Sequence, residues 1–475
     1  MKVKINLNDL KYRYDVYQIF NLFYPYDAIE FGEEQSNFKV IVEDSCIILE
    51  SAGKNLEKTF EDTVTKQHLK REIFKFLKDI THKELPWGTL VGIRPSKIAL
   101  DMVKDGYDNE AIIKHFKNHY LASEKKAQLC IDVASREESF VNHDKDLVSV
   151  YVGMAFCPTR CVYCSFASNP IGGNKKLVEP YVECLKQEIS AIADYIKQKD
   201  LRVQCVYFGG GTPTAVDEET FHGVMKEIYD DIIAQFSPEE FTVECGRPDS
   251  ITEKKLRTMK EFKVNRISIN PQTMNDDTLK SIGRNHNSKD VIEKFNLARN
   301  LGFDNINMDI IVGLPGEGLK EIKHTLDLIK KLNPDNLTVH GMSIKRASKL
   351  HEEIVLKNSV KIAEQEELNK MYEATTVAAE ELGMKPYYMY RQKNMVGNME
   401  NIGYSKKDKE SIYNIQIIEE KQTILAAGAD AVTKVVFLDE NRLERFADVK
   451  DIREYVKRLP EMVEKKIELL NTLYS

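Results

Sequence analysis

The sequence of 475 residues predicts an α/β protein built around a partial (β/α)6 TIM-type barrel. An added N-terminal α+β domain and a mainly helical C-terminal region are expected on either side. The barrel is predicted because, from Leu147 onward, short β-branched runs alternate with longer amphipathic segments, as in repeated βα units. The length exceeds one ordinary core, which favours two or three domains. We expect domains at residues 1–145, 146–345 and 346–475.

Six strands with helices between them are expected in the barrel. The strands cover Val148–Ala155, Val203–Phe208, Phe241–Cys245, Arg266–Asn270, Asn305–Val312 and Asn336–Ser343. The helices cover Leu177–Lys197, Glu218–Ala234, Glu253–Phe262, Lys289–Leu301 and Leu319–Leu332. In barrels of this type the loops after the strand carboxyl ends build the active site.

The flanking regions have weaker patterns. Strand-like sequence surrounds Phe38–Leu49, and helical patterns cover Val64–Asp79 and Asn109–Phe140. Beyond the barrel, Val360–Leu382 predicts a charged amphipathic helix, and the tail after Leu443 is again helical in pattern.

Composition excludes some classes of protein. Hydrophobic residues make up 42% and charged residues 30%, as is typical of a soluble globular protein. The net charge of -7 gives no support for a nucleic-acid partner. The N-terminus lacks the apolar stretch of a secretion signal, and no run reaches the length of a membrane span. We therefore expect a cytoplasmic protein.

Three cysteines follow the first barrel strand: Cys157, Cys161 and Cys164, spaced C-x3-C-x2-C. Three thiolates hold three irons of a [4Fe-4S] cluster and leave the fourth iron open to a small chelating ligand. That open site indicates chemistry on S-adenosyl-L-methionine. A zinc site would need a fourth ligand and a disulfide framework would need paired cysteines, and neither pattern is present. The alternative is three ordinary buried thiols.

This cysteine spacing resembles the signature of the radical-SAM enzymes. The resemblance implies a [4Fe-4S] cluster and S-adenosyl-L-methionine as cofactors. In that family the methionine amino and carboxylate groups chelate the open iron, and one electron from the cluster yields a 5'-deoxyadenosyl radical. A reducing protein such as flavodoxin or ferredoxin is the implied partner.

Over roughly residues 147–440 the chain resembles the oxygen-independent coproporphyrinogen III dehydrogenase branch of that family, and specifically its HemZ-type subfamily. The shared segments lie in the loops after the predicted strands, including Gly209–Thr214. The resemblance implies cofactor contacts from Tyr151, Tyr163, Gly210, Gly211, Thr212, Glu244, Gln272, Arg284 and Asp309.

The charged and amide residues of this set suit such a ligand. Arg284 can hold a carboxylate bidentately, and Glu244 can orient that arginine or accept from a ribose hydroxyl. Their positions allow an ion pair across the barrel mouth that serves the ligand, and the alternative is a salt bridge at the rim that contributes little. Asp309 lies in an apolar strand and is expected to be satisfied, because an unpaired buried charge is costly. Gln272 either contacts a ligand hydroxyl or caps a strand.

Each of the two tyrosines near the predicted site has two interpretations. By analogy with the family, Tyr151 and Tyr163 pack near the cluster and the adenosyl group, although either would also suit a protein core. Phe156 and Phe166 flank the cysteines and are expected to shield the cluster from water, which affects its potential.

The resemblance implies a reaction on a tetrapyrrole. The radical takes a β-hydrogen from a propionate side chain, and loss of carbon dioxide and one electron leaves a vinyl group. Two such events convert coproporphyrinogen III to protoporphyrinogen IX in oxygen-independent haem biosynthesis. Carboxylates of that substrate need hydrogen-bond donors. The candidate contacts are Arg247, Arg391 and Gln392, with Lys345, Arg346 and Lys393 as further cations.

Two other functions stay open: a haem-binding chaperone on the same scaffold, and a radical-SAM enzyme that acts on haem or another tetrapyrrole. The chaperone's C-terminal histidine-asparagine and tyrosine-tryptophan motif is not evident, since the only tryptophan is Trp87. The best-known dehydrogenase has a histidine where this chain has Gly153, and a further cysteine where it has Phe166. These departures concern the substrate and the use of a second S-adenosylmethionine.

Overall fold

The computed structural model describes residues 2–164, 168–343, 362–392 and 395–474. The chain divides into two compact units, each described by itself. Unit 1 comprises Met1–Ser135, Glu364–Lys370 and Tyr390–Glu400, and unit 2 comprises Arg136–Ala363, Met371–Met389 and Asn401–Ser475. C-terminal residues thus contribute to both units, and the division at residues 145 and 345 stays a proposal.

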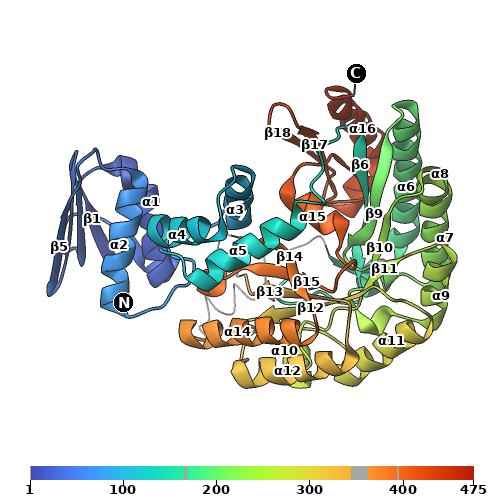
Figure 1. The fold of residues 1–475 in the computed structure, drawn as a ribbon. Helices are drawn as coiled ribbons and strands as arrows, with labels where there is room; N and C mark the ends of the chain where they lie inside the picture. Colours follow the sequence, from blue (N-terminus) through green and yellow to red (C-terminus); the bar gives the residue numbers. More distant parts are fainter. Residues whose placement is uncertain (1, 165–167, 344–361, 393–394, 475) are drawn as a thin grey trace. The chain divides into compact units, whose positions relative to one another are not determined.

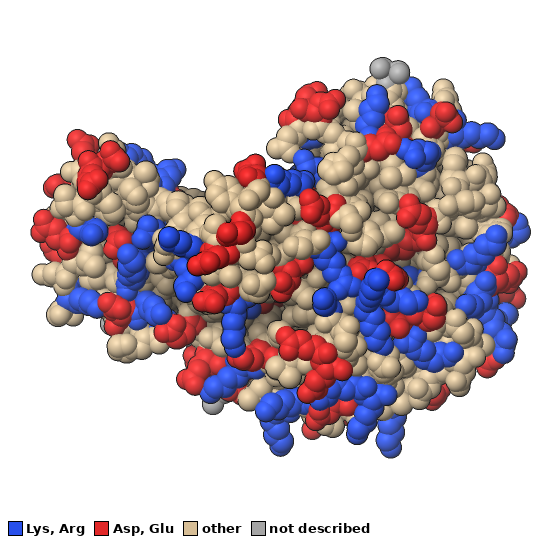
Figure 2. Space-filling view, in the orientation of Figure 1, with Lys and Arg blue, Asp and Glu red and all other residues tan. Residues whose placement is uncertain are grey.

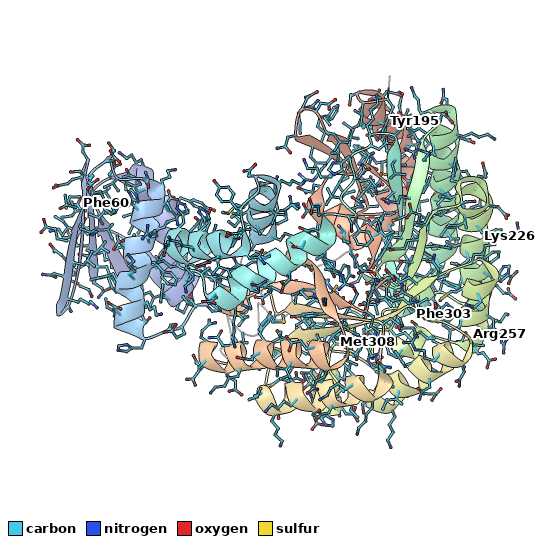
Figure 3. The ribbon with its side chains drawn as sticks, viewed as in Figure 1. Phe60, Tyr195, Lys226, Arg257, Phe303 and Met308 are labelled. Atoms are coloured by element: carbon cyan, nitrogen blue, oxygen red, sulfur yellow. The ribbon has the colours of Figure 1, made fainter. Side chains whose placement is uncertain are left out.

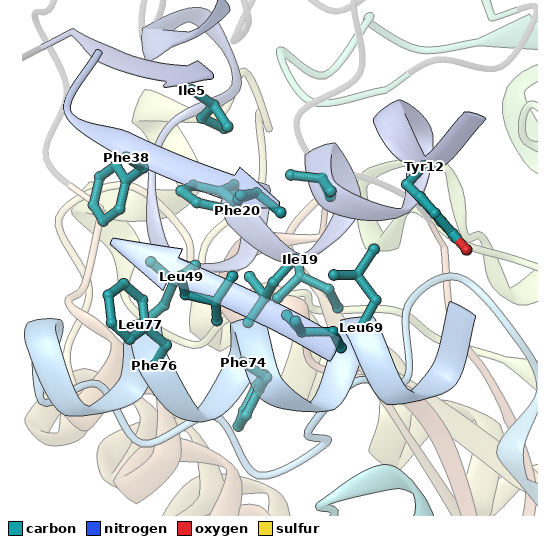
Figure 4. Packing of buried hydrophobic residues seen from close by; sticks show 14 of the residues in the cluster. Ile5, Tyr12, Ile19, Phe20, Phe38, Leu49, Leu69, Phe74, Phe76 and Leu77 are labelled. Carbon is teal, nitrogen blue, oxygen red and sulfur yellow. The ribbon is translucent and has the colours of Figure 1, made fainter. Parts of the chain in front are cut away.

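Unit 1 holds a five-stranded sheet in the order β2-β1-β3-β4-β5. Its strands are β1 (Val3–Leu7), β2 (Ile29–Phe31), β3 (Phe38–Val42), β4 (Cys46–Ser51) and β5 (Lys54–Thr59), and its helices are α1 (Arg13–Phe23), α2 (Lys66–Thr81), α3 (Pro95–Lys104), α4 (Asn109–Tyr120) and α5 (Glu124–Glu137). Apolar residues of α1 and α2, including Phe20 and Leu69, pack against Phe38 and Leu49 of the sheet to form one core (Figure 4). This region is α+β, as predicted.

Unit 2 holds an 11-stranded sheet in the order β14-β15-β13-β12-β11-β10-β9-β6-β16-β17-β18. Its six central strands run parallel to one another. They are β6 (Leu147–Met154), β9 (Arg202–Gly210), β10 (Glu240–Glu244), β11 (Arg266–Ser268), β12 (Ile306–Val312) and β13 (Asn336–Gly341). Each lies where the sequence predicts a strand, so the six βα units are confirmed.

Helices lie along the outer side of this curved sheet (Figure 1). They are α6 (Ile171–Gln198), α7 (Glu218–Ile228), α9 (Glu253–Glu261), α11 (Ser288–Asn300) and α12 (Leu319–Leu332), with the short α8 (Ala234–Phe236) and α10 (Asp276–Ser281) between them. Arg257 on α9 and Lys226 on α7 project from this layer, whereas Met308 of β12 is fully buried (Figure 3).

The two faces of the sheet differ in polarity. Along β6, Val148, Val150 and Val152 are fully buried, and residues between them such as Ser149 and Tyr151 point to the opposite face. On β10 to β13 the second face is polar, with Glu240, Thr242, Glu244, Ser268, Asn307, Asp309, Thr338 and His340. Polar residues are costly to bury without partners, so a strand face rich in them indicates a site.

Helix α15 (Ile412–Glu419) covers the polar face near the amino ends of the strands. Glu240 accepts hydrogen bonds from Ser411 Oγ at 3.0 Å and Ile412 N at 2.6 Å, where this helix begins. Tyr413 of the helix stacks on Tyr207 of β9, with ring centroids 4.5 Å apart. The carboxyl ends of the strands are therefore the end at which polar side chains remain for a ligand.

The C-terminal region contains more strand than predicted. It includes α14 (Gln365–Glu381), α15 and α16 (Ile452–Asn471), but also β14 (Lys385–Tyr390), β15 (Asn401–Ser405), β16 (Ile424–Ala427), β17 (Val432–Phe437) and β18 (Arg442–Ala447). β16 extends the parallel set because it pairs in parallel with β6, whereas β15 and β17 pair antiparallel to their neighbours. Short apolar runs such as residues 424–427 show no periodicity, so the sequence pattern did not predict these strands.

The surface carries no dominant sign of charge on the face that Figure 2 shows, where Lys and Arg intermix with Asp and Glu. Within the described parts of the chain, no helix has the length and apolar character needed to cross a membrane.

Candidate cluster and cofactor site

The cysteine loop begins where β6 ends. Cys157 belongs to the short strand β7 (Phe156–Cys157), which pairs with β8 (Asn169–Pro170). Cys157 and Cys161 are buried and Cys164 is half-buried. Cys164 N donates to Cys161 O at 3.1 Å, so the last two cysteines share one turn. Phe156 is fully buried beneath the loop, while Phe166 lies outside the described residues.

The glycines at the end of β9, Gly210 and the following Gly211, lie directly on the start of the cysteine loop. Gly211 N donates to Met154 O at 2.6 Å, and Thr212 N donates to Phe156 O at 2.8 Å. A Cβ on Gly211 would lie 2.6 Å from Phe156 O and 3.1 Å from Cys157 Sγ. Gly210 has φ +97°, a conformation that favours glycine. The glycines thus allow two strand-end loops to touch along their backbones.

The thiols have hydrogen-bond donors around them. Thr212 Oγ1 donates to Cys157 Sγ at 3.5 Å, and Ser168 Oγ donates to Cys164 Sγ at 3.8 Å. Burial raises the pKa of the Cys157 thiol to about 12, against the opposing effect of the Thr212 hydrogen bond. A metal ion deprotonates a thiol that it binds, so such a buried thiol still suits coordination.

The donor set suits an iron-sulfur cluster. Among the described residues, no three His, Cys, Asp or Glu side chains converge on one point where an ion could bind. In a [4Fe-4S] cluster each cysteine binds a different iron, so the three sulfurs need not converge. A [4Fe-4S] cluster is suited by the three thiols, by the backbone space that Gly211 leaves and by the hydrogen-bond donors near the sulfurs.

Arg284 lies beside the cysteine loop and is buried. Its Nη1 donates to Asn270 O at 2.6 Å and Gly246 O at 3.3 Å, whereas its Nε has no hydrogen-bond partner in the described structure. Burial raises the pKa of Tyr163, and the neighbouring Arg284 guanidinium opposes that rise. A buried guanidinium with an unused N–H group can hold a ligand carboxylate.

The predicted ion pair between Glu244 and Arg284 is not formed in the described structure, because Arg284 points its Nη1 to main-chain oxygens. Glu244 is instead half-buried next to Gly209, where a Cβ would lie 2.9 Å from Glu244 Oε2. Burial, followed by the charge of Asp309, raises the pKa of Glu244 to about 8. At neutral pH this group is mainly protonated and able to donate as well as accept.

Asp309 has the partners that its position in a strand requires. Asn307 Nδ2 donates to Asp309 Oδ1 at 2.7 Å, and His340 Nε2 lies 3.5 Å from Asp309 Oδ2. Burial acts to raise the pKa of Asp309, but His340 and Asn307 outweigh it and hold this pKa below its usual value. The carboxylate is therefore charged, beside a protonated neighbour at Glu244.

Gln272 occupies a strained position between β11 and β12. Its φ is +68°, and its backbone N and O bond Asp309 O and Ile311 N, each at 2.9 Å. Non-glycine residues in this region cost energy and often mark functional sites. No hydrogen bond of its side-chain amide is present among the described residues, so the amide is available to a ligand.

Tyr151 has contacts that match the core-aromatic reading. Its ring centroid lies 6.2 Å from that of Tyr207 and 6.3 Å from that of Tyr413, with all three rings nearly parallel. A contact of Tyr151 with a cofactor stays a proposal.

The predicted substrate contacts have other partners in the structure. Arg247 is 3% exposed and bonds within unit 2, next to the cysteine loop. Arg391 belongs to unit 1, where Nη1 and Nη2 donate to Leu90 O at 2.9 Å and Asn398 O at 2.6 Å over the ring of Trp87. Gln392 is half-buried in the same segment. Lys345, Arg346 and Lys393 lie outside the described residues.

Sequence reasoning missed His340 and Asp249. His340 lies on the polar face because it follows Thr338 by two residues on β13, a period that was readable from the sequence. Asp249 binds Arg247 through both carboxylate oxygens, which a sequence cannot reveal because the turn after β10 decides that pairing.

Comparisons with known proteins identify relatives of this chain. The model of the Radical SAM superfamily matches residues 151–329. The "oxygen-independent coproporphyrinogen-III oxidase-like protein HemZ" of Bacillus subtilis is 37% identical, over 100% of this chain and 99% of the relative. The "heme chaperone HemW" of the same organism is 33% identical, over 50% of this chain and 62% of that protein.

A solved structure shares the fold. "Coproporphyrinogen III oxidase (HemN)" from Escherichia coli, described as a radical SAM enzyme, aligns with a TM-score of 0.53 and 20% identity. The alignment covers 69% of this chain and 72% of that one. It supports the predicted radical-SAM α/β fold.

Proteins of the Radical SAM superfamily use a [4Fe-4S] cluster and S-adenosylmethionine, which confirms both predicted cofactors. The full-length match, at 37% identity, extends the relationship beyond the matched segment. The chain belongs to the Radical SAM superfamily, in the family of the oxygen-independent coproporphyrinogen-III oxidase-like protein HemZ.

Proposed function

We propose that this protein decarboxylates propionate side chains of coproporphyrinogen III to vinyl groups without oxygen, giving protoporphyrinogen IX. One structural observation carries the proposal: the loop of the three cysteines lies beside a buried arginine, Arg284, whose Nε has no hydrogen-bond partner among the described residues. That arrangement suits a cluster and a carboxylate-bearing cofactor side by side. The names of the full-length relative and of the solved oxidase support the tetrapyrrole.

The thiols of Cys157, Cys161 and Cys164 would hold the cluster. When bound, the cluster and S-adenosylmethionine supply a carbon radical able to remove a hydrogen atom from an unactivated carbon. The chain's own part is to place the cofactor, exclude water and hold charge. Phe156, fully buried under the loop, provides an apolar wall.

Residues at the carboxyl ends of the strands would each contact a different part of S-adenosylmethionine. Arg284 Nε would donate to the methionine carboxylate, and Gly210, Gly211 and Thr212 would border the methionine amino group. Glu244, protonated near neutral pH, and the charged Asp309 would hold ribose hydroxyls as donor and acceptor. Gln272 offers its free amide to the same moiety, and Tyr163 packs beside Arg284.

The substrate carboxylates need a different set of donors. Arg247 and Arg391 have hydrogen-bond partners of their own, so neither is retained as a substrate contact. Gln392 remains a candidate. We also propose that a small reducing protein such as flavodoxin or ferredoxin supplies electrons to the cluster.

The test is an anaerobic incubation of the reconstituted protein with S-adenosylmethionine, a reductant and coproporphyrinogen III. Mass spectrometry should show stepwise loss of two carboxyl groups from the tetrapyrrole, together with 5'-deoxyadenosine. Cys161→Ala is the matched control, and it should produce neither. Formation of 5'-deoxyadenosine with an unchanged tetrapyrrole would refute the substrate while leaving the cofactor chemistry in place.

A haem chaperone is the second candidate, because a protein of that name is 33% identical over half of the chain. The only tryptophan, Trp87, is fully buried in unit 1, where its Nε1 donates to Glu400 at 2.7 Å, so this ring is not free to face haem. Haem titration distinguishes the two functions, since a chaperone should bind haem stably without consuming it.

A further inference from the structure

The turn after β10 brings a second arginine, Arg247, to the cysteine loop. Gly246 has φ +42°, and this left-handed residue reverses the chain directly after β10 so that Arg247 points back to the carboxyl ends of the strands. Arg247 is only 3% exposed. A cation buried this deeply is held in place only by well-defined partners.

One side of the guanidinium is fixed by a carboxylate. Arg247 Nε donates to Asp249 Oδ1 at 3.0 Å and Nη2 donates to Asp249 Oδ2 at 2.9 Å. His286, whose side chain is fully buried, lies behind with Nδ1 3.6 Å from Asp249 Oδ1. This bidentate geometry leaves Nη1 as the only nitrogen of Arg247 directed elsewhere.

That nitrogen faces the cysteine loop. Nη1 donates to Thr159 Oγ1 at 3.0 Å and lies 3.6 Å from Cys161 Sγ. Thr159 in turn donates through Oγ1 to Gly283 O at 2.9 Å, which ties the loop to the segment that carries Arg284. The middle cysteine of the triplet therefore has a fixed positive charge and an N–H donor at its sulfur.

We propose that Arg247 is a positioning residue for the cluster: it donates to Cys161 Sγ and raises the reduction potential of the iron-sulfur centre. Hydrogen bonds to cysteine sulfur and local charge are main determinants of cluster potentials. A buried cation favours the reduced centre, which carries one more negative charge, and low local dielectric strengthens the effect. The inference rests on the proposed assignment of the three cysteines as cluster ligands.

The test is a redox titration of the anaerobically reconstituted full-length protein, followed by the electron paramagnetic resonance of the reduced cluster. Arg247→Gln keeps a planar group with N–H donors but removes the charge, and Arg247→Lys keeps the charge. Arg257→Met is the matched control: it removes an arginine that pairs with Glu253 on the exposed side of α9 (Figure 3).

We expect Arg247→Gln to lower the ratio of reduced to oxidised cluster about tenfold at a fixed applied potential, or about 59 mV for one electron. Arg247→Lys should recover most of this loss, and Arg257→Met should titrate as wild type. If Arg247→Gln does not fold, Arg247→Lys provides the test. A tenfold lower ratio of reduced to oxidised cluster in Arg247→Lys would contradict a role for the charge.

An intact cluster with wild-type potential in Arg247→Gln overturns the proposal and shows that Arg247 only braces the loop. Failure of the wild-type protein to bind any cluster would have another meaning. It would overturn the cysteine assignment and, with it, this inference. Iron and sulfide analysis of the wild type separates the two failures.

Discussion

Gly211 is the residue whose replacement tests the cysteine site most specifically. Its φ lies outside the left-handed region, so alanine can adopt its backbone conformation, and only space decides the outcome. A Cβ there would lie 2.6 Å from Phe156 O and 2.9 Å from Met154 O, both closer than the 3.0 Å that Cβ atoms keep. Neither atom can swing aside, because both belong to backbone that bonds Gly211 N and Thr212 N.

Gly211→Ala must therefore push the cysteine loop away from β9. Overpacking of this kind costs about 1–3 kcal/mol, and each 1.4 kcal/mol is about tenfold in an equilibrium constant. Because the cluster would bind the displaced loop, we expect weaker retention of iron by at least about fivefold. The assay is iron and sulfide content after anaerobic reconstitution and gel filtration, with thermal unfolding of the apoprotein recorded in parallel.

Gly173→Ala is the control, since a Cβ there meets nothing within 4 Å and Gly173 lies in α6. It should keep the cluster and be neutral or slightly stabilising. Wild-type iron content in Gly211→Ala would refute the reasoning, because it would mean that the two loops need not touch for the cluster to bind.

Three further predictions follow from buried groups. Lys466 bridges Glu188 and Asp448, whose side chains are fully buried, so Lys466→Met should lower the free energy of unfolding by about 3–5 kcal/mol in urea titrations; a loss near zero would contradict the bridge. The folded pKa of Glu244, about 8, exceeds its unfolded value, so its contribution to stability is full below the unfolded pKa and is lost as pH rises toward 8. From acidic to alkaline pH, the free energy of unfolding of Glu244→Gln should therefore rise by at least about 1.4 kcal/mol relative to that of the wild type, the equivalent of one pKa unit. A difference in stability between the two proteins that does not change with pH would count against this. Arg391→Ala should destabilise unit 1 by about 3 kcal/mol through two lost charged hydrogen bonds, measured by hydrogen exchange; unchanged protection there, with a raised KM, would restore a substrate role.

Much of unit 2 could be predicted from the sequence, because a parallel strand and its helix each bury one regular face. Alternation of β-branched runs and amphipathic segments located β6 and β9 to β13, and α12 begins and ends at Leu319 and Leu332 as predicted. The cysteine triplet and the glycines after β9 could be placed at one rim because parallel strands bring their carboxyl ends together.

Pairings between distant turns could not be predicted. Arg284 was expected to meet Glu244, but the turn that carries it brings its Nη1 to Asn270 O, while Glu244 is held next to Gly209. The charge of Arg247 predicts a substrate contact, but the sequence does not show that Asp249 pairs with it. Side-chain direction at such turns depends on backbone angles like φ +42° at Gly246, which composition and periodicity do not encode.

The central claim is that Cys157, Cys161 and Cys164 hold a cluster with one iron open to S-adenosylmethionine. The most direct measurement is the electron paramagnetic resonance spectrum of the reduced, reconstituted protein before and after S-adenosylmethionine is added. The account predicts a cluster signal that changes on addition and is followed by 5'-deoxyadenosine, with neither result in Cys161→Ala. A spectrum that S-adenosylmethionine leaves unchanged, or cleavage of S-adenosylmethionine by Cys161→Ala at the wild-type rate, would contradict it.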